Sequence, residues 1–185
     1  MDGFTLNGER YSYQRKCHAP DSERRVEMPI ISKLLQQHKG NRILEIGNVM
    51  HRITSVKRDV VDLHERGCIN SDITDYTPPH LYDLIVSIST LEHIGYKDNM
   101  HRAVKAAQRL PELLAKNGRL AVTWPLAYNH TLDYAAFSGR LPFTPFYMKR
   151  VNRENEWRQA PLREVENTQY NRPYPSANAI IVGMN

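Results

Sequence analysis

Five short segments between residues 42 and 125 are apolar along most of their length. They are RILEIG (42–47), DVVDLH (59–64), CINSDI (68–73), YDLIVSIS (82–89) and RLAVTW (119–124). Strands with nearly continuous apolar runs are buried on both faces, as in parallel sheets covered by helices. A sixth segment, NAIIVG (178–183), is expected to return to the same sheet. The pattern predicts an α/β fold with a doubly wound, mostly parallel sheet.

The clearest helical periodicity covers residues 98–116. Asp98 can cap the start of this helix, and Asn117-Gly118 can end it. Pro111 predicts a kink or a break, because proline lacks an amide hydrogen and clashes with the preceding turn. The apolar residues recur at i, i+3, i+4 and i+7, which places them on one helix face: Met100, Ala103, Val104, Ala107, Leu110 and Leu114.

Two further helices are expected on either side of the first strand. One begins at Pro29, which suits a first helical position, and extends to about His38. The other is a two-turn helix over residues 49–56. The next connections, around HERG (64–67) and DYTPPH (75–80), are too short for crossover helices. The sheet is therefore expected to be trimmed of some crossover helices.

The length of 185 residues favours a single domain. Residues 1–41 are expected to form an N-terminal helical cap, and residues 42–125 the core. Residues 126–185 combine many aromatic residues with prolines. Such a segment indicates ordered loops and short elements packed on a scaffold, so we expect a substrate cap that ends in the final strand.

The composition argues against several classes of protein, including nucleic-acid-binding and membrane proteins. The net charge is +5, yet no basic run exceeds two residues, so we expect no nucleic-acid partner. No apolar stretch approaches the roughly 18 residues of a membrane span, and the first residues lack the apolar core of a signal peptide. We therefore expect a cytoplasmic protein with no membrane partner. Cys17 and Cys68 are too few for a disulfide framework and are expected to be reduced thiols, and the scattered histidines predict no metal site.

Three residues at strand ends suggest a ligand site. Gly47 ends the first strand, where a glycine lets the backbone turn sharply and approach a ligand. Asp62 follows the second strand, where a carboxylate can accept hydrogen bonds from both hydroxyls of a ribose. Asp72 follows the third expected strand and could reach an adenine amino group. Each has an ordinary structural reading as a turn or cap, but their joint placement points to a nucleoside.

The motif series resembles that of class I S-adenosylmethionine-dependent methyltransferases. The matching segments are LEIG (44–47), VVDLHERG (60–67), SDITDY (71–76), YDLIVSISTLEHI (82–94) and LLAKNGRLAVTWP (113–125). The segment YDLIVSISTLEHI is the most specific of them, being similar to the fourth-strand motif of small-molecule methyltransferases. The resemblance covers residues 42–125 and implies a Rossmann-like sheet.

The resemblance also implies S-adenosylmethionine as the cofactor, held at the strand ends. The residues it implies are Glu45, Gly47 and Asn48 at the amino-acid end, Asp62 at the ribose, Asp72 and Ile73 at the adenine, and Ser87 and Ser89 beneath the sulfonium. The chain departs from the family in the first loop, where Asn48, Val49, Met50 and His51 stand in place of further glycines. This loop also lacks the glycines that a nicotinamide dinucleotide needs for its pyrophosphate.

Methyl transfer needs alignment of the reactants and exclusion of water, and needs a base only for a hydroxyl or a protonated amine. His93 is one candidate base. His130 is another, with Asp133 as its orienting carboxylate. Capping or packing roles remain open for all three. The residues expected to bind the acceptor are Tyr128 and Asn129, after the fifth strand, and Arg150, Arg153 and Trp157, which could grip an anionic or sugar-like group.

We therefore expect S-adenosylmethionine-dependent methyl transfer to oxygen or nitrogen of a small molecule, such as a sugar or nucleotide-sugar derivative. An alternative is a non-catalytic binding or scaffold module in a biosynthetic complex, which the altered first loop suggests. A different reaction on the same fold is a third hypothesis, since fold does not fix function. The sequence is compatible with an oligomer.

Overall fold

The computed structural model describes residues 3–13 and 21–185, so Cys17 lies outside the described residues. Its centre is a seven-stranded sheet with the strand order β4-β3-β5-β6-β9-β7-β8, and β1 and β2 form a separate hairpin. The strands are β1 (Gly3–Leu6), β2 (Glu9–Ser12), β3 (Ile43–Ile46), β4 (Asp59–Val61), β5 (Tyr82–Ile88), β6 (Leu114–Pro125), β7 (Thr144–Arg150), β8 (Trp157–Ala160) and β9 (Ala179–Met184). The helices are α1 (Arg24–Gln37), α2 (His101–Arg109) and α3 (His130–Phe137), with 3-10 turns η1 (Met50–Arg52), η2 (Leu91–His93), η3 (Leu110–Leu113) and η4 (Leu162–Glu164).

The sheet is parallel in one half and antiparallel in the other. Strands β4, β3, β5 and β6 pair in parallel. Strand β9 is antiparallel to both β6 and β7, and β8 is antiparallel to β7. The predicted α/β class and the return of the last strand are confirmed, and the C-terminal segment adds antiparallel strands to the parallel core.

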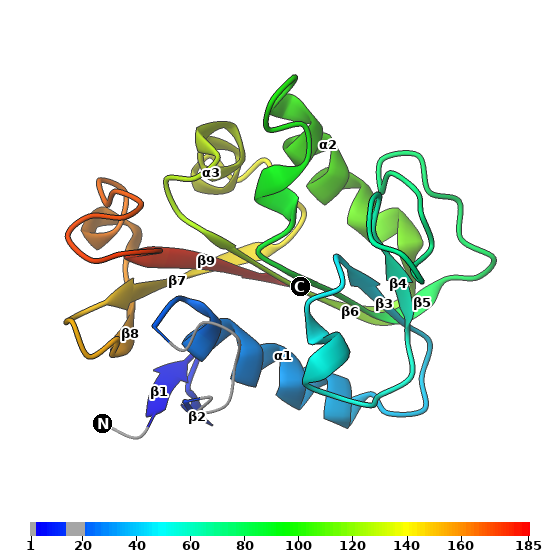
Figure 1. Cartoon of the computed structure of the whole chain (residues 1–185), viewed down its shortest axis with the longest axis horizontal. Helices are drawn as coiled ribbons and strands as arrows, with labels where there is room; N and C mark the ends of the chain where they lie inside the picture. Colours follow the sequence, from blue (N-terminus) through cyan, green and yellow to red (C-terminus); the bar gives the residue numbers. More distant parts are fainter. Residues whose placement is uncertain (1–2, 14–20) are drawn as a thin grey trace.

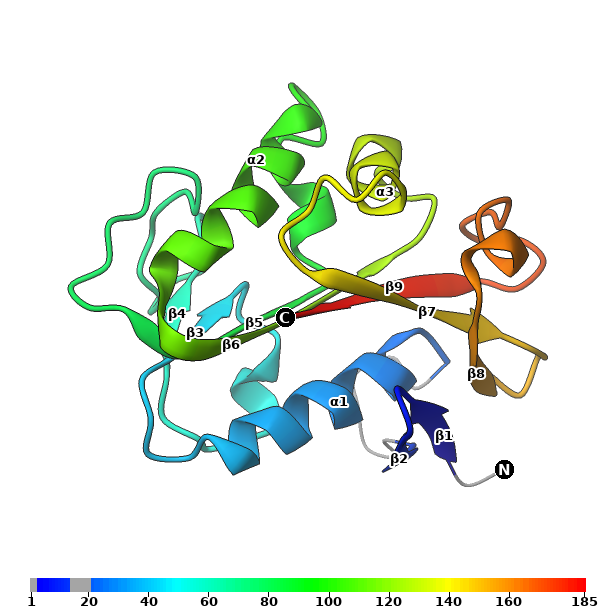
Figure 2. The same cartoon turned by 180° about the vertical axis from the view of Figure 1, so that it is seen from behind.

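Helices cover both faces of the sheet. In Figures 1 and 2, α1 and the β1–β2 hairpin lie on one face, while α2 and α3 lie on the other. Each face has its own hydrophobic cluster. Leu44 and Ile85 pack on the α2 side, and Ile43 and Leu84 pack with α1. The apolar runs are therefore buried on both sides, as the sequence predicted for parallel strands.

Two predicted helices have different bounds. Helix α1 begins at Arg24, so Pro29 lies inside it instead of at its first position, and the preceding turn buries Val26 and Met28. Helix α2 ends at Arg109, and the predicted break at Pro111 is confirmed because η3 follows there. The prediction that the helix continues to residue 116 was wrong, since Leu114 already pairs with Tyr82 in the sheet.

Two predicted elements are largely absent. The expected strand at 68–73 is reduced to one bridge between Ile69 and Val61. The expected two-turn helix at 49–56 is the single turn η1. Its later residues include β-branched Ile53 and Val56, which lose side-chain freedom in a helix. The C-terminal segment, expected to hold ordered loops and short elements, forms α3, β7 and β8.

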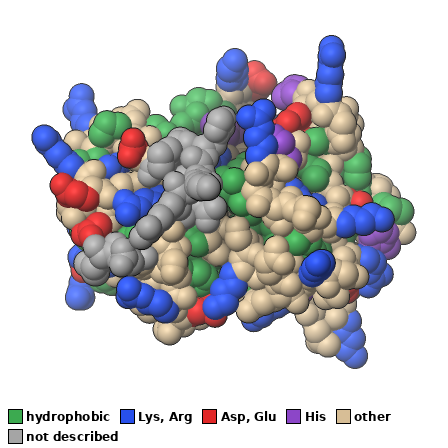
Figure 3. Space-filling view, turned by 60° about the horizontal axis from the view of Figure 1, so that its bottom comes forward, with side chains coloured by type: hydrophobic (Ala, Val, Ile, Leu, Met, Phe, Trp, Pro, Cys, Tyr) green, Lys and Arg blue, Asp and Glu red, His purple; other side chains and the backbone are tan. Residues whose placement is uncertain are grey.

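The surface is mixed in character. Lys and Arg side chains are spread across the face shown in Figure 3 and do not gather in one patch. Within residues 3–13 and 21–185, no helix has the length and apolar character needed to cross a membrane.

Candidate active site

A pocket lies at the carboxyl ends of β3, β4 and β5. The chain runs from β3 outward to β4 and then crosses to β5 on the other side of β3. Open α/β sheets bind ligands at the crevice where the strand order reverses in this way. The pocket has a volume of about 620 Å³, within the roughly 300–1,000 Å³ that is usual for small-molecule sites. The expected residues that line it are Gly47, Asp62, Asp72, Ile73, His93 and Tyr128.

Position 47 requires a glycine because of its backbone conformation and its contact with Thr90. Its φ angle is +79°, and a Cβ atom at this position would lie 2.2 Å from Oγ1 of Thr90. Its amide donates to the carbonyl of Val61 at 2.9 Å. The backbone of β3 thus turns tightly between the ends of β4 and β5 and leaves bare main chain at the pocket wall.

We expect Gly47→Ala to destabilise the fold by about 1–3 kcal/mol, because the side chain adds strain at positive φ and collides with Thr90. Urea unfolding measures this loss. Gly139→Ala is the matched control, since Gly139 has φ +66° and open space at its Cβ position. Adding Thr90→Ala should recover part of the Gly47→Ala loss. An equal loss in the two single glycine variants would contradict a role for the contact.

The residues that replace the family's glycines turn away from the pocket. Met50 is fully buried on the α1 side of the sheet, and Val49 packs against the same cluster. Asn48 donates from Nδ2 to Oε1 of Glu65 at 3.0 Å, so it joins the first loop to the next one. Of these loop residues, only Gly47 lines the pocket. The altered loop therefore leaves the pocket open, and the side chains of Val49 and Met50 add to the core.

The side chain of Glu45 holds this loop against the sheet. Its carboxylate accepts from the Met50 amide at 2.7 Å and forms an ion pair with Arg58. The side chains of Glu45 and Arg58 are only 0% and 7% exposed. Glu45 does not line the pocket, so the structure gives it a role in holding the first loop against the sheet.

Asp62 and Asp72 lie at the other wall of the pocket. Oδ1 of Asp62 accepts from the amides of His64 and Glu65 at 2.9 and 2.8 Å, which leaves Oδ2 without a hydrogen-bond partner among the described residues. Asp72 accepts from Thr74 and pairs with Arg102. Burial raises the pKa of Asp72, but the hydrogen bonds from Thr74 and the charge of Arg102 outweigh it and lower the pKa overall. Both acids are therefore set up as hydrogen-bond acceptors.

The end of β5 places different residues at the pocket than the sequence suggested. Ser87 is buried and donates to the carbonyl of Ile46 at 3.3 Å. Ser89 has φ +38°, and its hydroxyl donates to Oε1 of Glu27 at 2.8 Å, on the α1 side. Because of this turn, the side chain that reaches the pocket is that of Thr90. Strand alternation alone could not reveal the positive φ at Ser89.

His93 lies at the pocket beside an aromatic residue from another segment. Its ring contacts that of Tyr128 edge-on, with 4.8 Å between centroids. Burial, followed by the positive charge of Arg24, lowers the pKa of His93. The imidazole is therefore neutral at pH 7 and has a nitrogen that can accept a proton.

The expected pair of His130 and Asp133 does not form a base and its orienter. Asp133 accepts from Nε1 of Trp124 and from the amide of Ala127, both at 2.9 Å. Burial raises its pKa to about 6, against the lowering effect of these hydrogen bonds. His130 is exposed and outside the pocket lining. Asn129 caps α3 through the amide of Leu132 and donates to the carbonyl of Glu92, so it fixes the turn η2.

The basic and aromatic residues expected to grip the acceptor are used elsewhere. Arg150 is 6% exposed and donates to several carbonyl groups, including those of Asn152 and Pro175. Trp157 is buried, and its Nε1 donates to Asn155. The side chain of Arg153 is exposed. The guanidinium group of Arg150 thus joins chain segments, and none of the three residues lines the pocket.

The pocket is also lined by residues that no sequence motif indicates. They come mainly from the loops after β4 and η2, which carry no strong motif: Leu63, His64, Ser71, Ile94, Gly95, Tyr96, Lys97, Asp98 and Arg102. The pairing of Arg102 with Asp72 joins the start of α2 to the loop after β4, and sequence separation hides such a contact. In the described part of the chain, no three His, Cys, Asp or Glu side chains gather to hold a metal ion.

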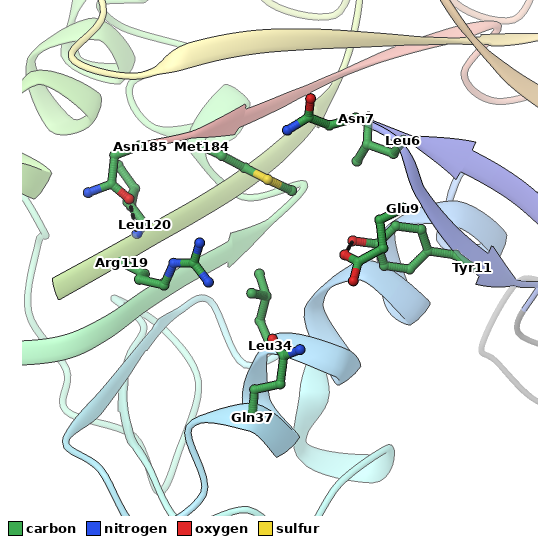
Figure 4. A pocket seen from close by; sticks show the side chains of 10 residues that line it. All are labelled: Leu6, Asn7, Glu9, Tyr11, Leu34, Gln37, Arg119, Leu120, Met184 and Asn185. Atoms are coloured by element: carbon green, nitrogen blue, oxygen red, sulfur yellow. Dashed lines mark hydrogen bonds between the residues drawn. The ribbon is translucent and has the colours of Figure 1, made fainter. Parts of the chain in front are cut away.

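A second, smaller pocket lies at the opposite end of the sheet. Its volume is about 240 Å³, and Figure 4 shows its lining from the hairpin, α1, β6 and β9. Arg119 and Leu120 of β6 pair with Leu84 and Ile85, in the first half of β5, so this pocket lies away from the carboxyl ends of the parallel strands. Ligands of parallel α/β sheets bind at the carboxyl ends of the strands, so the larger pocket is the candidate active site.

Comparison with solved structures gives the fold. The chain is similar to an rRNA methylase from Streptococcus thermophilus, with 12% identity and a TM-score of 0.53 over 86% of this chain and 95% of that one. It is also similar to a functionally unknown protein from Deinococcus radiodurans R1, with 14% identity and a TM-score of 0.50 over 93% and 90%. An N-methyltransferase, NodS from Bradyrhizobium japonicum WM9 in complex with S-adenosyl-L-homocysteine, has 14% identity and a TM-score of 0.49 over 84% and 86%.

Neither the family models nor the curated proteins yield a match to the sequence. The likeness is therefore one of fold, that of the class I methyltransferases.

Proposed function

We propose that this chain uses its class I methyltransferase fold to bind S-adenosylmethionine in the 620 Å³ pocket and to transfer the methyl group to oxygen or nitrogen of a small molecule. The observation that carries the proposal is the joint placement of Gly47, Asp62 and Asp72 in one pocket at the switch point of the sheet. The motif segments of the sequence supply these residues in the order of the strands.

The residues present fit the cofactor. The open backbone at Gly47 and the hydroxyl of Thr90 would face its amino-acid end. The free oxygen of Asp62 would accept from the ribose hydroxyls, and buried Ile73 would pack against the adenine beside Asp72. When bound, the cofactor supplies a methyl group attached to a positively charged sulfur.

The protein's own task in such a reaction is to position the acceptor, exclude water and hold a proton. His93 is the base that the geometry favours, because its neutral imidazole lies at the pocket while His130 does not. Tyr128 lies against it and would form the acceptor side of the pocket. We propose a small-molecule acceptor, with sugar and nucleotide-sugar derivatives as the first class to test, and neither nucleic acid nor a membrane as partner.

The proposal includes a cytoplasmic location for the protein. A cytoplasmic location is compatible with Cys68, which is a free thiol. Burial raises the pKa of this thiol, which keeps it in the protonated, less reactive form.

Isothermal titration calorimetry with S-adenosylhomocysteine tests the binding half of the proposal. We expect saturable 1:1 binding by the wild type and by Arg119→Ala, a variant in the pocket of Figure 4. Methyl transfer is then measured with labelled S-adenosylmethionine and a panel of hydroxyl and amine acceptors. No heat of binding together with co-purification of a partner protein would instead support the non-catalytic scaffold that the sequence left open.

A further inference from the structure

Three buried carboxyl groups, from the start of α1 and the turn η2, lie near enough to act on one another electrostatically. Glu27 and Glu92 are 0% and 1% exposed, and Glu23 is 8% exposed. Glu23 and Glu27 come from the start of α1, and Glu92 comes from the turn η2 after β5. Burial raises the pKa of Glu92, and the charges of Glu27 and then Glu23 add to this effect.

These acids differ in how they are satisfied. Glu27 accepts from Ser89 at 2.8 Å and pairs with Arg24 at 3.2 Å. Glu23 accepts from the amide of Ala177 at 3.1 Å. Neither carboxyl oxygen of Glu92 has a hydrogen-bond partner among the described residues, and Nε2 of His93 lies 3.6 Å from Oε1. A buried carboxyl group without partners costs free energy, so Glu92 has an unmet capacity to bind a donor.

Three tyrosines whose rings contact one another reach from the pocket lining toward the segment before β9. The ring of Tyr128 contacts those of Tyr96 and Tyr170, with centroids 5.0 and 5.3 Å apart. Tyr96 and Tyr128 line the pocket. Burial raises the pKa of Tyr170, and the charges of Glu23, Tyr128 and Glu92 add to this effect. We call Glu23, Glu27, Glu92, Tyr96, Tyr128 and Tyr170 the acid–tyrosine site.

We propose that the acid–tyrosine site binds an organic amine as a cation, and that the methyl acceptor is therefore an amine. Aromatic faces attract ammonium groups electrostatically, most strongly where water is excluded. The carboxylate of Glu92 would accept the N–H bonds that it lacks in the free protein. A neutral hydroxyl offers neither the charge nor the multiple donors that this arrangement can use. The identity of the acceptor rests on the proposed function, while amine binding can be measured without the cofactor.

The protonation change on binding follows from the same geometry. The ionisable groups facing Glu92 are Glu23, Arg24 and Glu27 from α1, His93 from its own turn, Tyr128 from the loop after β6, and Tyr170 from the segment before β9. Burial, followed by the charges of Glu27 and Glu23, raises the pKa of Glu92 well above its ordinary range, which favours the protonated carboxyl in the free protein. An arriving ammonium group would ionise it, and the carboxyl proton would go to the solvent. Amine affinity should therefore rise as pH increases from 5 to 8.

Calorimetry with two matched probes tests the proposal. Cyclohexylamine and cyclohexanol share a six-membered ring and differ in the charged group. We expect the wild type to bind the amine at least tenfold more tightly than the alcohol. Glu92→Gln, which keeps the side-chain shape, should bind both probes equally weakly. Glu112→Gln is the control, because Glu112 is an exposed acid in η3, and it should bind the amine as the wild type does.

Two further readouts need no variant or cofactor. The heat of amine binding to the wild type should differ between phosphate and Tris buffers, because a proton is released, and the amine affinity should follow pH as described. Equal affinities for amine and alcohol, unchanged amine affinity in Glu92→Gln, or pH-independent binding would each overturn the amine site. A separate titration with S-adenosylhomocysteine reports on the proposed function, so the failure of one is distinguished from the failure of the other.

Discussion

Replacing Arg58 by alanine should lower the free energy of unfolding by about 3–5 kcal/mol, the range expected when one partner of a buried ion pair is removed. Arg58 pairs with Glu45, and both side chains are almost fully buried. Without the guanidinium, the carboxylate of Glu45 would remain in the core next to the amide of Met50 that it holds. The loss would also loosen the first loop, because Glu45 is the residue that ties this loop to β3.

Urea unfolding of the wild type and the variant measures this loss. Arg42→Ala is the matched control, since Arg42 pairs with Asp83 on the surface, where the two side chains are 51% and 33% exposed. Exposed pairs contribute only about 0.2–1 kcal/mol. A loss in Arg58→Ala no larger than that in Arg42→Ala would show that the buried pair does not hold the loop.

Replacing Asp62 by alanine should weaken S-adenosylhomocysteine binding by about 10- to 100-fold. Hydrogen bonds to a charged group contribute about 1.5–3 kcal/mol, and about 1.4 kcal/mol corresponds to a factor of ten. The variant would also lose the bonds from Oδ1 to the amides of His64 and Glu65 that shape the loop. Calorimetry gives the dissociation constants.

Two other variants separate these effects. Asp62→Asn keeps an oxygen for the loop amides and removes the charge, so its affinity should fall between those of the wild type and Asp62→Ala. Asp75→Ala removes an exposed acid from the neighbouring loop and should leave affinity unchanged. If Asp62→Ala bound as tightly as Asp75→Ala, the assignment of the ribose position would fail.

The parallel half of the fold could be predicted from sequence because its strands are apolar on both faces. That pattern located β3, β5 and β6, and it brought Gly47, Asp62 and Asp72 to one edge. The carboxyl ends of parallel strands meet whatever the loops between them do. The C-terminal strands β7 and β8 escaped prediction because aromatic residues and prolines mask their alternation.

The residues that bind the methyl acceptor were harder to predict, because the type of a residue does not reveal which groups it hydrogen-bonds to. Arg150 and Trp157 are suitable for binding a ligand, yet both are satisfied within the protein. Asp133 was expected beside His130 but instead accepts from Trp124. Conversely, no sequence pattern singles out Glu92, and only its burial without hydrogen-bond partners distinguishes it. Such properties depend on contacts between distant segments.

The most direct test of the central claim is a crystal structure of the protein soaked with S-adenosylhomocysteine. The account predicts electron density in the pocket between Gly47 and Asp72, with the ribose hydroxyls within hydrogen-bond distance of Asp62 and the sulfur facing His93 and Tyr128. Density confined to the small pocket of Figure 4, or no density at a saturating concentration, would contradict it.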